Sequence, residues 1–311
     1  MPVSAATCWA AYVVAIVSVF ATIPFVDAAF PSLGPLAKSL LLDVGGTIVV
    51  YCFSFVGGNS SVYDPYWCIA PLCLGFYCKS EAPGGFWFYE PRETLCLVLL
   101  WAWAIRFIVG IPWEGWTMGL HHEDWRYVKF QKQMPSAVYW AFSFSSFHLT
   151  PTLLVFAGLA PALRVILQGT SAPPLNALDA AAAMLTTCGI VIEGVADSQL
   201  RRFRTAQREG SATCTVGLWR WSRHPNYCGE CTFWTGLLCF GVSSGAATAE
   251  PALAIGAPLM WAFFRFASVP LMDERSLERR RGAYELVMQT TSALLLWPPS
   301  GAGGPSRPKK A

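Results

Sequence analysis

Long apolar runs recur along the chain, and seven of them are long enough to form helices that cross a bilayer. A helix needs about 20 mostly apolar residues to cross a hydrocarbon core of about 30 Å. The seven runs cover residues 7–26, 36–56, 94–111, 136–166, 178–196, 228–244 and 251–272. The pattern therefore predicts an all-α fold, a polytopic membrane helix bundle with about seven transmembrane helices.

Two apolar runs need a separate interpretation. The first could be a signal peptide, but no basic segment precedes it, and it continues into Pro24 and Asp27 without a clear small-residue cleavage site. We interpret it as an uncleaved span. A shorter run at residues 66–77 cannot cross a bilayer, so we expect it to be re-entrant or to lie at the membrane interface.

Composition agrees with a membrane protein. Hydrophobic residues make up 54% of the chain and charged residues only 13%, against about 25% charged residues in a typical soluble domain. The net charge of +3 gives no reason to expect a nucleic-acid partner. The expected surroundings are a lipid bilayer and a lipid-soluble ligand.

Lys and Arg in the short connections predict the orientation. They cluster in residues 114–133, in residues 197–226 and after residue 272, whereas residues 57–90 and 168–177 are poor in them. Seven spans would place all three basic segments, and the C-terminus, in the cytosol. The sequence Asn59-Ser60-Ser61 would then be a possible lumenal glycosylation acceptor.

The chain divides into three parts by composition. Residues 1–60 hold N-terminal transmembrane helices, residues 61–299 form the main membrane domain, and residues 300–311 form a basic tail. The tail is rich in Gly, Pro and Ser, so we expect it to be disordered. Its Lys309-Lys310 pair faintly resembles a dilysine retrieval signal but is one place off the usual pattern, so it gives weak support to an endoplasmic reticulum location.

Charged residues appear on one helical face where the fifth apolar run ends. Glu193, Asp197 and Arg204 are spaced at i, i+4 and i+11. Glu193 lies near the end of a span, where an ionisable group is costly and suggests a functional site. The alternative is a cytosolic helix end whose arginines meet anionic headgroups, and that interpretation explains Arg201, Arg202 and Arg208.

The block at residues 217–230 is the most specific in the chain. Pro225 suits the first turn of a helix, so its free amides would point toward the cytosol beside Arg223 and His224. Such a helix start suits a phosphate. Asn226 can recognise a carboxamide or a ribose, and Glu230 is hard to explain as packing. The alternative is a turn that binds lipid phosphates.

No metal site or Rossmann fold is predicted. Cys228 and Cys231 follow His224 at helical spacing, but no other His lies nearby, so packing explains them better. No Gly-x-Gly-x-x-Gly sequence follows a predicted strand.

The combination of these motifs resembles the steroid 5α-reductase-like membrane proteins, and among them the branch known as domain of unknown function 1295. The resemblance covers roughly residues 61–299. Its motifs are Glu123-Asp124-Trp125-Arg126-Tyr127, Asp197-x-Gln199 with Arg204, the run from Arg223 to Glu230, and Thr291-Ser292-Ala293 followed by Trp297-Pro298-Pro299. An Arg-His-Pro-x-Tyr run also resembles the sterol C14 reductases and the isoprenylcysteine carboxyl methyltransferases. The motif alone therefore leaves NADPH and S-adenosylmethionine both open.

The resemblance implies a reductase that takes hydride from NADPH and saturates a C=C bond conjugated to a carbonyl. Carried onto matching positions, it implies that the cofactor is held by Asp197, Arg204, Arg223, His224, Asn226 and Tyr227, with Arg220 and Glu274 as weaker candidates. The negative charges of NADPH suit an Arg-rich pocket. The expected catalytic residues, which supply an electrophile and a proton, are Tyr227, Glu230, Asp124 and Tyr127.

The substrate half of the resemblance is weaker. The steroid reductases carry a glutamine- and glutamate-containing motif on an early helix, and this chain has no counterpart. Asp43 on the second run is either a substrate contact or simply a residue near the end of a span. A lipid-soluble substrate follows, but a steroid does not. The alternative functions are a membrane methyltransferase, a non-enzymatic lipid-binding or scaffold protein, and a transporter, which is disfavoured because the polar groups gather at one end of the spans.

Overall fold

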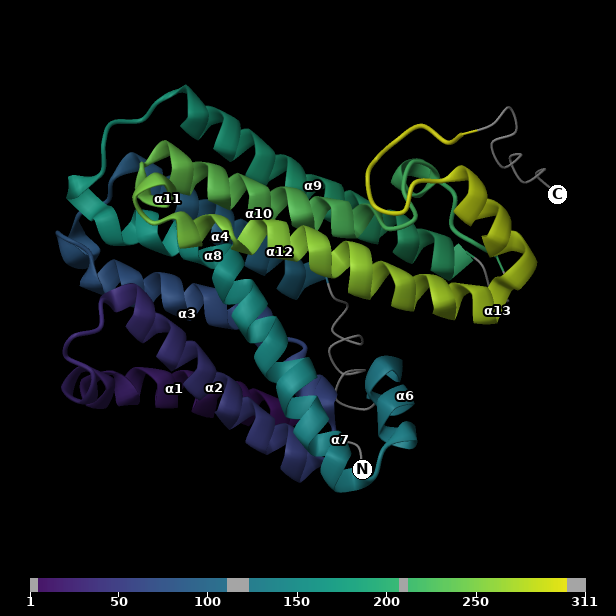
Figure 1. Ribbon diagram of the computed structural model, residues 1–311, viewed down its shortest axis with the longest axis horizontal. Helices are drawn as coiled ribbons and strands as arrows, with labels where there is room; N and C mark the ends of the chain where they lie inside the picture. Colours follow the sequence, from purple (N-terminus) through teal and green to yellow (C-terminus); the bar gives the residue numbers. More distant parts are fainter. Residues whose placement is uncertain (1–4, 111–122, 207–211, 301–311) are drawn as a thin grey trace. The chain divides into compact units, whose positions relative to one another are not determined.

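The computed structural model describes residues 5–110, 123–206 and 212–300. This part of the chain is helical and holds no strand; Ser222 and Ser292 form one isolated β-bridge. The all-α prediction is therefore confirmed (Figure 1). Residues 301–311 of the predicted tail lie outside the described residues.

The α-helices vary from a single turn to 30 residues. They are α1 (Ala5–Ala29), α2 (Pro35–Gly57), α3 (Tyr66–Glu81), α4 (Pro91–Gly110), α6 (Trp125–Gln133), α7 (Ser136–Phe142), α8 (Thr150–Gln168), α9 (Ala177–Ala206), α10 (Pro225–Ser243), α11 (Ala246–Ala249), α12 (Gly256–Phe263) and α13 (Val269–Thr290). Short 3₁₀ segments are η1 (Ser60–Tyr63), η2 (Gly85–Trp87), η4 (Gly169–Ser171), η5 (Gly217–Arg220) and η6 (Pro251–Ala254). Two π-helical segments, η3 (Ser143–Leu149) and η7 (Phe264–Ser268), join α7 to α8 and α12 to α13.

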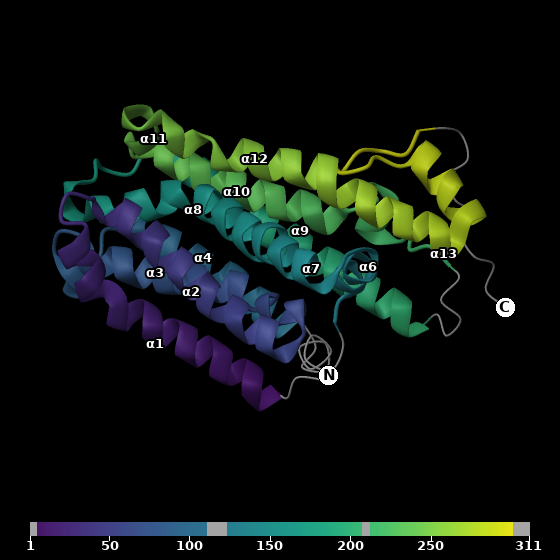
Figure 2. The ribbon, with the colours of Figure 1, turned by 60° about the horizontal axis from the view of Figure 1, so that its bottom comes forward.

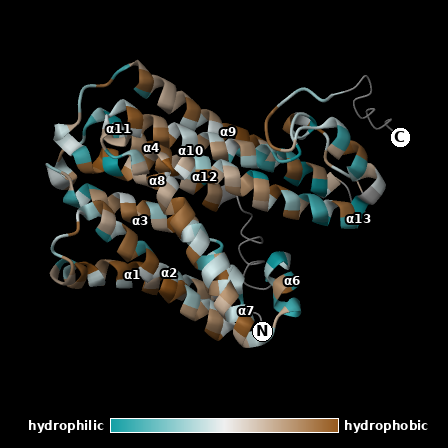
Figure 3. Ribbon diagram, viewed as in Figure 1, coloured by the Kyte–Doolittle hydropathy of each residue, from teal (hydrophilic) through white to brown (hydrophobic). Residues whose placement is uncertain are grey.

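Five helical stretches are long and apolar enough to cross a membrane. They are Ala6–Ala29, Pro35–Gly57, Ser136–Ser171, Ala177–Ala206 and Pro251–Arg280. The other two predicted spans form α4 and α10, which do not meet the same criterion. α4 carries Arg92, Glu93 and Arg106, and α10 begins with a polar turn. Figure 3 shows hydrophobic residues along the long helices and hydrophilic residues collected on α6 and α13.

The chain forms two compact units, which are described separately. Unit 1 comprises residues 1–179 and 237–256, and unit 2 comprises residues 180–236 and 257–311. In unit 1, α2 packs against α1, α3 and α8, and α4 packs against α3 and α8. Figures 1 and 2 both show α1 and α2 side by side.

α3 contains the short apolar run at residues 66–77, which the sequence predicts to be re-entrant or interfacial. This helix packs against α1, α2, α4 and α8 and belongs to the core of unit 1. Tyr66, Leu74 and Cys78 on it are all at most 3% exposed. Its 16 residues fall short of the length that crosses lipid unaided. The predicted re-entrant or interfacial position of this helix stays a prediction.

The segment η1 contacts the start of α6. The backbone N–H of Ser60 donates to Glu123 Oε1 at 2.8 Å, and the backbone N–H of Asp124 donates to Ser61 Oγ at 2.8 Å. The hydroxyl of Tyr127 donates to Asp64 Oδ1 at 2.5 Å. The beginning of the segment 57–90 therefore lies beside residues 123–127 of the basic segment, and not across the membrane from them as predicted.

This contact also removes the glycosylation interpretation of Asn59. The Asn59 side chain is 3% exposed, and its Oδ1 accepts a hydrogen bond from the backbone N–H of Ser61 at 2.9 Å. A side chain that caps η1 inside the fold cannot receive a glycan.

In unit 2, the backbones of α9 and α10 touch. A Cβ added to Gly229 would lie 2.7 Å from the Gly189 carbonyl oxygen, and one added to Gly236 would lie 2.6 Å from the Thr186 backbone nitrogen. Small residues permit this approach, which is a common way for helices to pack in membranes. The contact fixes α9 and α10 side by side and places Glu193 next to Gly229.

Candidate functional site

The sequence motifs that follow α9 and close the chain meet in unit 2. The backbone N–H of Arg223 donates to the Ser292 carbonyl at 2.8 Å, and that of Trp297 donates to the Trp221 carbonyl at 3.1 Å. The Ser222 hydroxyl donates to the Leu294 carbonyl at 2.9 Å. The closing segment therefore lies along the chain that leads into α10, which explains why both motifs occur together.

Arg223 is held on two sides. Its Nη2 donates to Asp273 Oδ2 at 2.8 Å. Its Nη1 donates to the carbonyls of Met288 and Thr291, at 3.2 and 2.9 Å, where α13 ends. The guanidinium satisfies carbonyl groups that a helix end leaves without partners. Arg223 thus joins the start of α10 to both ends of α13.

His224 is held by the same carboxylate. Its Nε2 lies 2.9 Å from Asp273 Oδ1. Its ring stacks on Tyr227 with a centroid distance of 5.3 Å and an interplanar angle of 9°. Tyr227 in turn lies 4.8 Å from the Phe264 ring.

Asp273 is the central residue of this cluster, and sequence analysis missed it. It is 6% exposed and accepts hydrogen bonds from Arg223, His224 and the hydroxyl of Tyr284. Burial raises the pKa of Tyr284, and the adjacent carboxylate adds to the rise, so the phenol remains a donor. Sequence analysis named the neighbouring Glu274, which is exposed. The missed signal was an acid directly after an apolar span, where an unpaired charge is costly.

Asn226 and Tyr227 lie in the first turn of α10 and are partly exposed. Within the described residues, the Asn226 side chain makes no hydrogen bond. Its amide can therefore donate to and accept from a ligand.

Two buried carboxyl side chains lie farther along α9 and α10. Glu230 is 4% exposed, and its Oε1 accepts a hydrogen bond from Trp234 Nε1 at 3.0 Å. Glu193 is also 4% exposed, and its Cβ would lie 3.0 Å from a Cβ built on Gly229. The close contact of α9 and α10 thus brings Glu193 and Glu230, both singled out in the sequence, to neighbouring positions on the two helices.

Arg204, Arg279 and Arg280 form a cationic group near Cys214. Arg280 interrupts α13 with non-helical dihedral angles, φ −146° and ψ 35°. Burial raises the pKa of Cys214, and the guanidiniums of Arg204 and Arg280 oppose that rise, which indicates that both are close to it. Among the residues that the structure describes, Arg204 has no ion pair. This group is suited to an anion.

The connection between α9 and α10 is fixed to α9. The Gln199 side-chain oxygen accepts a hydrogen bond from the Leu218 N–H at 2.9 Å, and Trp219 Nε1 donates to the Ala196 carbonyl at 2.9 Å. Gly217 has φ +57°, and a Cβ there would meet the Gln199 amide at 2.3 Å. Asp197, on the same stretch of α9, is partly exposed, while Arg220 is exposed.

The other two predicted catalytic residues, Asp124 and Tyr127, belong to unit 1 and form hydrogen bonds there. Asp124 caps α6 and pairs with Arg126 Nε at 2.7 Å. Tyr127 donates to Asp64, and burial raises the pKa of Asp64 to about 6. Both side chains therefore make structural contacts, in line with the alternative that residues 123–127 are an anchor paired with nearby basic residues, and their catalytic role stays a prediction.

Asp43 lies inside α2 and is 4% exposed. Within the described part of the chain it has no hydrogen-bond partner, although the Tyr66 hydroxyl packs on Gly46 one turn away. An unpartnered acid inside a span is costly. The burial of Asp43 inside the helix is compatible with a substrate contact, which stays a prediction. Its neighbours are residues of unit 1.

No group of three or more His, Cys, Asp or Glu side chains that could hold a metal ion occurs among the described residues.

Comparisons with known proteins agree with part of the resemblance found in the sequence. A family described as "Protein of unknown function (DUF1295)" matches residues 50–291. An uncharacterized protein of Schizosaccharomyces pombe, C594.04c, is 25% identical over 226 residues, which cover 67% of this chain and 64% of that protein. No solved structure matches. These comparisons give no support for or against a relationship to the steroid reductases.

Proposed function

The chain belongs to the DUF1295 family, and we propose that it is a membrane-bound, NADPH-dependent reductase of a lipid. The reaction would saturate a C=C bond conjugated to a carbonyl. The observation that carries the proposal is the cationic group of Arg204, Arg279 and Arg280 in the same unit as the uncommitted amide of Asn226. A group of neighbouring guanidiniums suits a ligand with several phosphates.

The residues of this chain divide into those that would touch the cofactor and those that position them. Arg204 and Arg280 would bind phosphate, and Asn226 would recognise a carboxamide or ribose. Arg223 and His224 already pair with Asp273, so we assign them a positioning role that fixes the start of α10. This assignment changes the role that the resemblance implied for them.

Tyr227 and Glu230 are the groups on the first turns of α10 that can carry a proton. NADPH, when bound, would supply the hydride. Tyr227 is oriented by its stacking on His224, and Glu230 by the Trp234 indole. Such fixed neighbours support proton transfer, because a donor held in one geometry needs no reorganisation.

The alternative of an S-adenosylmethionine-dependent methyltransferase fits this cluster less well. S-adenosylmethionine carries a sulfonium cation and no phosphate. Arg204 and Arg280, which lie close together, favour a polyanion over a cation.

The test is ligand binding by the detergent-purified protein, measured as thermal stabilisation by NADPH, NADH and S-adenosylmethionine. A ligand at 100 times its dissociation constant should add roughly 2.7 kcal/mol to the free energy of unfolding. We expect stabilisation by NADPH that weakens in Arg204→Gln and Asn226→Ala. Arg201→Gln is the matched control, because it removes the same charge from the same helix.

Arg223→Ala is a poor test, since it also removes the cap of α13. Stabilisation by S-adenosylmethionine alone would replace the reductase proposal with the methyltransferase. A folded sample that none of the three ligands stabilises would favour a non-enzymatic lipid-binding protein.

A further inference from the structure

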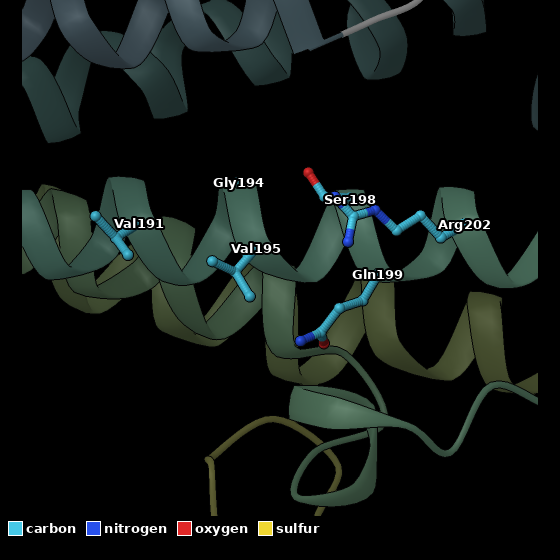
Figure 4. Close-up of a pocket in the computed structure, with 6 residues that line it drawn as sticks. All are labelled: Val191, Gly194, Val195, Ser198, Gln199 and Arg202. Atoms are coloured by element: carbon cyan, nitrogen blue, oxygen red, sulfur yellow. The ribbon is translucent and has the colours of Figure 1, made fainter.

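A hollow of about 580 Å³ lies along α9, and its lining includes none of the residues assigned above to catalysis and phosphate binding. It is lined by Val191, Gly194, Val195, Ser198, Gln199 and Arg202 (Figure 4). These residues recur every three or four positions, so they form one continuous face of the helix.

The lining changes from apolar to cationic along the helix. Val191 and Val195 are 55% and 40% exposed inside a predicted membrane span. Ser198 and Arg202 follow toward the end of that span, and both are exposed. Figure 4 shows the Arg202 side chain running back along the helix toward Ser198. Eleven residues separate Val191 from Arg202, which is roughly 16 Å along the axis at 1.5 Å per residue.

That length matches one leaflet, because half of a hydrocarbon core of about 30 Å is about 15 Å. The polar end of this lining is also available to a ligand. Within the described residues, Arg202 has no ion pair and the Ser198 hydroxyl has no hydrogen bond. Gly194 has no side chain, which leaves the middle of the face hollow.

We propose that this groove binds an anionic glycerophospholipid of the bilayer. One acyl chain would lie on Val191, Gly194 and Val195, and the phosphate would meet Arg202 and Ser198. Charge complementarity selects the anionic headgroup, since an Arg guanidinium donates several hydrogen bonds to phosphate oxygens.

A bound lipid would also touch Gln199, which holds Leu218 and thereby the connection to α10. Lipid binding is independent of the proposed reductase activity. It would hold equally for a non-enzymatic protein.

The test is native mass spectrometry of the full chain, released from detergent micelles doped with phosphatidylglycerol or phosphatidylcholine. We expect retention of phosphatidylglycerol in preference to phosphatidylcholine. Arg202→Gln should weaken that retention about tenfold, the loss expected for one charge-assisted contact. Gly194→Leu, which fills the hollow, should also reduce it.

Arg201→Gln is the control, because it removes the same charge one residue away and outside the lining. Equal losses in Arg201→Gln and Arg202→Gln would overturn the proposal in favour of diffuse attraction to the headgroups. Equal binding of both lipids, or displacement by glycerol phosphate at the concentration of the lipid, would also overturn it.

Discussion

Asp273 shows how one buried carboxylate can organise residues that a motif presents as binding groups. Arg223 and His224 look like phosphate ligands in the sequence, yet both meet Asp273 first. Asp273 lies 50 residues from Arg223, so no local pattern links the two. The spacing of the motif predicted where the cluster lies but not what its members bind.

We expect Asp273→Ala to lower the free energy of unfolding by about 3–5 kcal/mol, because it leaves a buried guanidinium and imidazole without their carboxylate. Tyr284→Phe removes a single hydrogen bond and should cost about 1 kcal/mol. Chemical denaturation in detergent measures both. Glu274→Gln, at an exposed neighbour, is the control, and an Asp273→Ala variant as stable as that control would contradict the assignment.

Asp64 predicts a pH dependence in unit 1. Burial raises its pKa to about 6, whereas the unfolded value is about 3.9. The folded state therefore binds more protons between these values, and its stability falls as pH rises from about 4 to about 6. Asp64→Asn keeps an acceptor for Tyr127 and should remove this slope. The measurement is the melting temperature of both proteins from pH 4 to 7.5, and parallel curves would show that Asp64 does not titrate there.

At the scale of elements, apolar runs predicted the long helices well, because a span is a local property of the sequence. α3 was predicted less fully, because its packing against α1, α2, α4 and α8 joins residues far apart in the sequence. The contacts of η1 with Glu123, Asp124 and Tyr127 were also not predictable, since they join residues about 63 positions apart. Glu230 and Asn226 were found because polar residues at the entrance of a span are rare.

The contact between α9 and α10 gives a prediction of its own. Gly229→Ala would place a methyl group 2.7 Å from the Gly189 carbonyl oxygen, so the helices must separate. Overpacking of this kind costs about 1–3 kcal/mol. Gly282→Ala in α13 is the matched control, because nothing lies within 4 Å of its added Cβ. A Gly229→Ala protein that melts with the control would show that the backbones do not touch.

At the scale of the whole chain, unit 1 revises the predicted membrane topology. The Tyr12 hydroxyl donates to the Val62 carbonyl at 2.8 Å, so the first half of α1 lies beside η1. η1 in turn contacts the start of α6. The N-terminal end of α1 therefore lies on the same side as α6, which belongs to a basic segment. An arrangement of seven spans would place the N-terminus on the opposite side from that segment.

Glycosylation reporters can test this arrangement. An acceptor sequence on a flexible linker at the N-terminus, or between Gly57 and Ser60, should remain unmodified. The same insertion at η2 (Gly85–Trp87), where Trp87 is 90% exposed, should be glycosylated, because α3 and α4 carry the chain to the other side and back. Removal of glycans with a glycosidase, read on a gel, gives the result. Glycosylation of the first two insertions but not of the third would show that the opposite orientation is the correct one.

The π-helical segment η7 affects how relatives can be compared residue by residue. A π turn closes its hydrogen bond one residue later than an α turn, so Phe264–Ser268 stores one extra residue just before Asp273. Each residue added to a regular α-helix turns the following side chains by about 100°. The π-helical segment accommodates the extra residue, so the side chains that follow it keep their orientation. A relative that is one residue shorter between Pro251 and Asp273 can therefore keep its acid facing Arg223, and an alignment without a gap would place the wrong residue there.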